Sequence, residues 1–168
     1  MHQHIKSVAD IYAFNTLSVR ACLQGLANDD AGRRWRQGEG SSILFLVGHI
    51  LSSRVGLLRR FGAAEENPYA ELFGAGAETR DPADYPTIEE LARGWDDVAA
   101  RFESTLESLT EEQILAPAEG LPVPDRTGRG ALMFLSWHES YHVGQLGLML
   151  TEMGYKSLQA RVHEALGD

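Results

Sequence analysis

Two of the six histidines, His138 and His142, lie four residues apart in a segment with a helical apolar pattern. In an α-helix this spacing separates two side chains by about 40° around the axis and about 6 Å along it, so both imidazoles can reach a common ion. Two buried imidazoles on adjacent turns would repel each other if protonated and would leave polar atoms unsatisfied if neutral. A divalent cation, which takes neutral imidazole as a ligand, removes both problems. The pair therefore predicts a metal site.

A third candidate ligand, His49, lies in an earlier apolar helical segment, where Ser53 and Gly56 on the same face leave space beside the ring. A single histidine on an apolar face is more often a core residue whose ring nitrogens are satisfied by neighbours. We therefore predict His49 as a ligand only in combination with His138 and His142. The remaining histidines lie near the ends of the chain and are interpreted as surface residues.

The sequence HESYH at 138–142 also matches H-E-x-x-H, in which the glutamate is the general base for a zinc-bound water. This match makes Glu139 a candidate catalytic residue. However, Glu139 is rotated about 100° from His138 and about 60° from His142, so it could equally point into solvent. The overlapping E-x-x-H of di-iron bundles requires a second copy, which the sequence lacks.

Four long segments with helical periodicity must position these residues. They span approximately residues 5–27, 42–61, 88–109 and 128–153, and a short amphipathic segment follows at 157–166. Thr87 and Glu90 form a capping-box pattern before the third segment. Each apolar stripe must be buried against another, which predicts an all-α four-helix bundle in one domain, residues 1–168. The links at 62–86 and 116–127 are long and rich in proline or glycine, and the sequence does not reveal the role of the first.

Composition excludes several classes of function. The formal net charge is −9, and only two lysines occur, so no basic surface is available to bind nucleic acid. The longest strongly apolar run, residues 43–51, is too short to cross a membrane, and the first residues lack the pattern of a signal peptide. Cys22 is the only cysteine and cannot form an internal disulfide. We expect a cytoplasmic protein that acts on a small molecule.

Gly48-His49, together with the segment SWHESYHVGQL at 136–146, resembles the DinB family, and the similarity extends over most of the chain. The resemblance implies a four-helix bundle in which His49, His138 and His142 bind one divalent metal, commonly zinc or nickel, with iron as a further candidate because imidazole also suits it. Homodimers are common among similar proteins, so a homodimer is also implied. Relatives include thiol-dependent maleylpyruvate isomerases and bacillithiol transferases, which implies a low-molecular-weight thiol as a second cofactor.

Three histidine ligands leave a coordination position open, which is typical of catalytic rather than structural zinc. We therefore expect a metal-dependent thiol transferase that acts on a small electrophile. Gln145 and Asn15 are candidates for holding the imidazoles or the substrate in place. Two alternatives stay open: a hydrolase that uses Glu139 as its base, and a metal-binding stress protein without catalytic activity.

Overall fold

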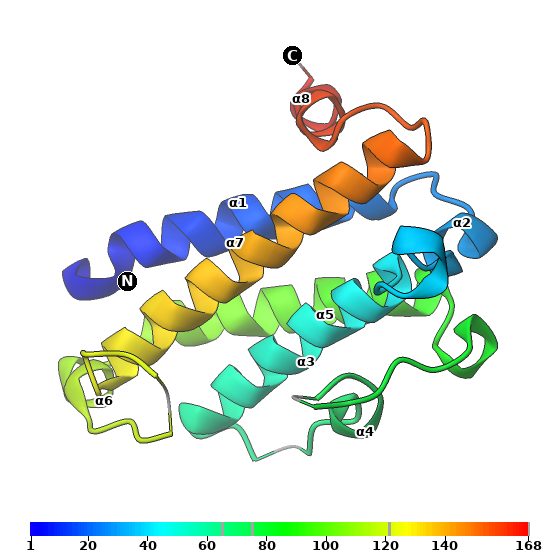
Figure 1. Cartoon of the computed structure of the whole chain (residues 1–168). Helices are drawn as coiled ribbons and strands as arrows, with labels where there is room; N and C mark the ends of the chain where they lie inside the picture. Colours follow the sequence, from blue (N-terminus) through cyan, green and yellow to red (C-terminus); the bar gives the residue numbers. More distant parts are fainter. Residues whose placement is uncertain (65, 75, 121, 168) are drawn as a thin grey trace.

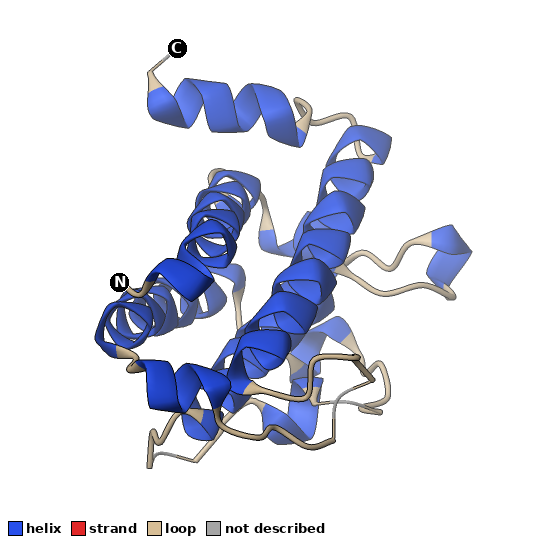
Figure 2. Cartoon of the chain, turned by 90° about the vertical axis from the view of Figure 1, so that its left-hand side faces the viewer, coloured by secondary structure: helices blue, strands red, loops and turns tan. Residues whose placement is uncertain are grey.

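A computed structural model describes residues 1–64, 66–74, 76–120 and 122–167, with the side chain of residue 37 excepted. Its main elements are four long helices: α1 (Lys6–Leu23), α3 (Ile43–Arg60), α5 (Ile88–Ser108) and α7 (Gly128–Glu152) (Figure 1). Shorter helices join or follow them: α2 (Asn28–Gly32), α4 (Ala70–Phe73), α6 (Glu111–Leu115) and α8 (Leu158–Leu166). The part of the chain that is described contains no strand (Figure 2). The all-α fold class is confirmed.

The four long helices surround one apolar core. Helix α1 contacts α5 and α7, and α3 contacts the same two helices from the other side, while α8 lies across α1 and α7. The α5 stripe that the sequence predicts is buried, with Trp95 and Phe102 almost fully enclosed. The contact between α3 and α7 brings residues near 49 and near 140 together, although about ninety positions separate them in the chain.

Local sequence signals set most helix boundaries. Ser42 and Thr87 cap α3 and α5, and the predicted capping box between Thr87 and Glu90 is present. The first segment differs from expectation because α1 ends at Leu23 rather than near residue 27. Gly25, with a φ of +66°, turns the chain there, and the Asn28-Asp29-Asp30 sequence begins α2 instead of ending a helix.

The link at 62–86 is not wholly irregular, since it contains α4 and a short 3₁₀ turn at Pro82–Asp84. In Figure 1, α4 lies below α3, and the two helices are in contact. Among the described helices, none is long and apolar enough to span a bilayer.

Candidate metal centre

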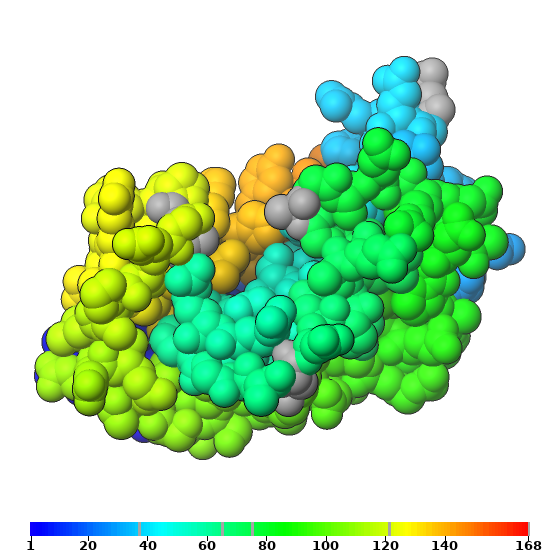
Figure 3. Space-filling view, turned by 90° about the horizontal axis from the view of Figure 1, so that it is seen from below, coloured from blue at the N-terminus to red at the C-terminus, as the bar shows by residue number. Residues whose placement is uncertain are grey.

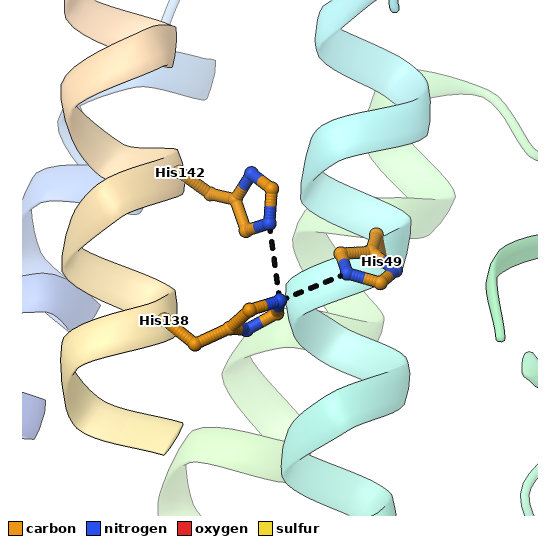
Figure 4. A group of neighbouring side chains, drawn as sticks. All are labelled: His49, His138 and His142. Carbon is orange, nitrogen blue, oxygen red and sulfur yellow. Dashed lines mark hydrogen bonds between the residues drawn. The ribbon is translucent and has the colours of Figure 1, made fainter. Parts of the chain in front are cut away.

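The three predicted ligands meet between α3 and α7 (Figure 4). His138 Nε2 lies 3.2 Å from His49 Nε2 and 3.2 Å from His142 Nε2. One ligand nitrogen from each ring lies within 4.8 Å of the other two, and among the described residues no carboxylate or thiol completes a larger group. In a tetrahedral zinc site with Zn–N bonds of about 2.0–2.1 Å, ligand nitrogens are roughly 3.3 Å apart. The spacing of these imidazoles therefore fits a single ion.

Hydrogen bonds fix the orientation of two of the rings. His49 Nδ1 lies 2.7 Å from the carbonyl oxygen of Phe73, which can only accept, so Nδ1–H donates and leaves a lone pair on Nε2 of the neutral ring. In the same way His142 Nδ1 lies 2.6 Å from Gln145 Oε1. Each ring thus turns Nε2 toward His138, in the tautomer that a metal requires.

The cluster lacks a negative charge that would balance protonated rings. Burial, and then the proximity of His142 and His49, lowers the pKa of His138 from 6.5 to about 4. Burial is also the main cause that lowers the pKa of His142, against a smaller opposing effect of the Gln145 hydrogen bond. His138 Nδ1 is buried and has no hydrogen-bond partner among the described residues. His49 Nε2 and His142 Nε2 each direct a lone pair at His138 Nε2, which carries at most one proton in the neutral ring and can donate to only one of them. A cation between the three rings would satisfy all three Nε2 atoms. The cluster can hold a divalent metal.

The centre is more accessible than the sequence suggests. All three histidines are half-buried, because they lie on the flank of α7 and α3 rather than on the faces that point into the core. Aromatic rings surround them: Phe45 stacks on His49 at 6.0 Å between ring centroids, Phe134 on His138 at 6.4 Å, and Tyr141 contacts His142 edge-on at 5.3 Å. In Figure 3 the surface is hollowed between the yellow segment that precedes α7 and the green and cyan residues, with α7 visible in orange at its base. A small molecule can approach such a site.

Glu139 lies in a different cluster. Its side chain is 4% exposed, and its two oxygens accept hydrogen bonds of 2.6 and 2.7 Å from Arg54 on α3. Arg54 also donates to Thr16 Oγ1 and to the carbonyl of Tyr12, and its guanidinium lies 4.2 Å from the centroid of the Trp95 ring. A carboxylate engaged in this way is not free to take a proton from a nucleophile, so the placement does not fit the expected catalytic base. The solvent-exposed alternative is wrong as well, because the 100° rotation turns Glu139 into the core.

Gln145 and Asn15, the candidates for holding the imidazoles or the substrate in place, differ in whether they contact a histidine. Gln145 contacts His142 directly, and its amide nitrogen lies 3.5 Å from the Tyr141 hydroxyl. Asn15 is buried on α1, where its amide donates to Ser140 Oγ at 3.0 Å, and none of its described hydrogen bonds reaches a histidine.

Two residues with clear roles were not predicted. Phe73 acts through a backbone carbonyl, for which sequence gives no signal. Arg54 could have been found from the sequence, because a single charged residue within the apolar segment 43–58 requires a buried partner.

Comparison with known proteins agrees with this architecture. A family model described as the DinB superfamily matches residues 16–146. A crystal structure of a DinB-like protein from Bacillus cereus aligns with a TM-score of 0.68 and 20% identity, covering 94% of this chain and 97% of that one. YfiT from Bacillus subtilis, described as a probable metal-dependent hydrolase with an unusual four-helix bundle topology, aligns with a TM-score of 0.61 and 17% identity over 93% and 91% of the two chains. No curated protein matches the chain. Because the family model matches most of the sequence, and because the fold agrees with that of the DinB-like structure, the chain belongs to the DinB superfamily.

Proposed function

We propose that this protein is a metal-dependent transferase that joins a low-molecular-weight thiol to a small electrophile. The observation that carries the proposal is the convergence of three imidazole Nε2 atoms, two of them oriented by Phe73 O and Gln145 Oε1, at a half-buried position. Three protein ligands leave room for an exogenous one. A divalent metal held there supplies an acidified nucleophile at neutral pH, since coordination deprotonates a thiol and lowers the pKa of water.

The surroundings favour a thiol over water as that nucleophile. A hydrolytic mechanism with a carboxylate base needs a free carboxylate beside the metal, but Glu139 is engaged by Arg54, and no acidic residue joins the described histidine cluster. A coordinated thiol needs no such base. In the transfer, the thiol proton goes to solvent and the sulfur bonds to the electrophilic carbon, whose leaving group departs with its electron pair.

The chain's own residues would bind and orient the reactants. Phe45, Phe134 and Tyr141 present apolar and aromatic surface next to the imidazoles, which suits an organic electrophile better than a highly charged one. The Tyr141 hydroxyl, 3.5 Å from the Gln145 amide nitrogen, could hydrogen-bond to a substrate.

The test is a turnover assay of the purified protein loaded with zinc or nickel, using a panel of small thiols and a chromogenic aryl halide. We expect thiol consumption that requires the metal and is lost in His138→Ala. Thiol consumption that survives complete metal removal would contradict the proposal.

Hydrolysis is the second candidate, favoured by the description of YfiT as a probable metal-dependent hydrolase. It would use the same metal centre without Glu139 as base. Metal-dependent cleavage of ester or amide substrates in the absence of any thiol would support it over the transferase. Absence of turnover in both assays, with metal bound, would leave the non-catalytic metal-binding protein as the better account.

A further inference from the structure

Two contacts between the described part of the link at 62–86 and α3 lie one helical turn apart. Asn67 donates to the carbonyl and the hydroxyl of Ser52 at 3.1 and 2.9 Å. The fully buried ring of Phe73 lies directly over Gly48. His49 lies between these two positions on α3. Its Nδ1 makes a further contact with the link, to the Phe73 carbonyl.

Gly48 makes this contact sterically feasible. A Cβ atom at position 48 would lie 2.4 Å from Phe73 Cζ and 2.5 Å from Cε1 and Cε2, far inside van der Waals distance. The ring cannot easily move away, because it stacks on Tyr85 at 5.3 Å and meets Phe45 edge-on at 6.1 Å. Tyr85 is itself held by a 2.7 Å hydrogen bond from the Arg80 backbone. The absence of a side chain at position 48 therefore determines how closely the Phe73 carbonyl approaches α3.

We infer that the Gly48–Phe73 contact is a positioning device for the metal centre: it places a backbone carbonyl from the link at 62–86 on His49 and so fixes the ring orientation and tautomer in which Nε2 faces the other two imidazoles. Hydrogen bonds of this kind to a ligand histidine change metal affinity by roughly 10–100-fold. The inference depends on metal binding by the histidines and not on the reaction that the protein catalyses.

The chain offers a matched control. Gly56 lies on the same helix two turns later, and a Cβ there would meet nothing within 4 Å. Gly48→Ala and Gly56→Ala therefore make the same chemical change on α3, but only the first displaces Phe73. With zinc titrated against a competing chelator, we expect Gly48→Ala to weaken binding by about 10-fold or more and Gly56→Ala to leave it unchanged. Equal affinities in the two variants would overturn the inference.

Coupling between the two positions separates this effect from general damage. Phe73→Ala removes the ring that meets a Cβ at position 48. We expect Phe73→Ala to weaken zinc binding by itself, and Gly48→Ala to cause little further loss in that background. Losses that simply multiply would mean that the two residues act independently, which contradicts the positioning role.

A readout on the metal-free protein covers the case in which Gly48→Ala does not fold. Long-range ¹H–¹⁵N spectra of imidazole rings report which nitrogen carries the proton. The wild-type protein without metal should show His49 protonated at Nδ1 only, while folded Gly48→Ala should show a mixture of tautomers. A wild-type His49 protonated at Nε2 would overturn the inference even if zinc binds. Failure of the wild-type protein to bind zinc would instead contradict the metal centre itself.

Discussion

Helices α3 and α7 share two neighbouring polar clusters, which differ in how fully the charges and hydrogen bonds of the chain satisfy them. Arg54 and Glu139 are both buried, bear opposite charges and are held by further bonds to α1. His49, His138 and His142 are half-buried, have no opposite charge in their group, and point their Nε2 atoms at one another. Residues 138 and 139 are adjacent in sequence, yet the helix turns one outward and the other inward. Interactions within the chain satisfy the first cluster, whereas the second leaves His138 Nδ1 without a partner among the described residues and can hold an external ion.

The largest expected effect is the loss of stability when the ion pair between Arg54 and Glu139 is broken. Arg54→Leu leaves the Glu139 carboxylate buried without its partner, which costs about 3–5 kcal/mol and should lower Tm by on the order of 10 °C in thermal unfolding. Arg54→Leu/Glu139→Leu should recover most of the loss, because no charge is then left unpaired. A double variant as unstable as the single one would mean that packing of the guanidinium on Trp95, rather than the ion pair, stabilises this region.

Removing one imidazole should weaken zinc binding and leave the stability of the metal-free protein nearly unchanged. His138→Ala deletes a group that gains no hydrogen bond at Nδ1, so the stability of the metal-free protein should stay the same or rise slightly. Zinc affinity, measured by competition with a chelator, should fall by on the order of 100-fold or more, beyond the effect of losing a hydrogen bond to a ligand. Marked destabilisation of the metal-free protein would show that the histidine cluster is structural, like its neighbour.

A smaller effect is expected at Gln145. Gln145→Leu removes the acceptor that orients His142 and should weaken zinc binding by about 10-fold. Gln145→Glu supplies a stronger acceptor at the same distance and should bind zinc at least as tightly as the wild type. If both variants lose affinity equally, the amide does not act through the hydrogen bond to His142.

The smallest effect concerns pH. The pKa of His138 is about 4 in the folded protein and near 6.5 when unfolded, so at low pH the unfolded chain binds a proton that the folded chain rejects. The metal-free protein should therefore lose stability as pH falls from about 6.5 toward 4, and be unaffected by this group above 6.5. Denaturant unfolding across that range should show a shallower pH dependence for His138→Ala than for wild type. Identical profiles would mean that His138 is not desolvated in the folded state.

Sequence accounts for the two clusters unequally. The i,i+4 spacing is sufficient to bring His138 and His142 together, because helix geometry alone sets their relative position. The meeting with His49 depends on how α3 packs against α7: its place on an apolar helical face made it a candidate, and the resemblance to the DinB family implied that it joins the other two. That these residues bind a metal stays a prediction.

The remaining errors concern long-range contacts. Rotation along α7 was enough to separate Glu139 from the histidines, but it left open whether the side chain faced solvent or core. The Arg54 partner decides this, and its position depends on the fold. The Phe73 carbonyl is a backbone group in a link whose course has no local signal. Polar groups whose partners come from another element are thus the ones that single-sequence reasoning could not assign.

The most direct test of the central claim is zinc titration of the metal-free protein by calorimetry, with X-ray absorption of the loaded sample to identify the ligands. The account predicts one zinc per chain, a coordination shell that includes three imidazole nitrogens, and loss of this site in His138→Ala but not in Gly56→Ala. Absence of stoichiometric binding, or a zinc shell with fewer than three imidazoles, would contradict it.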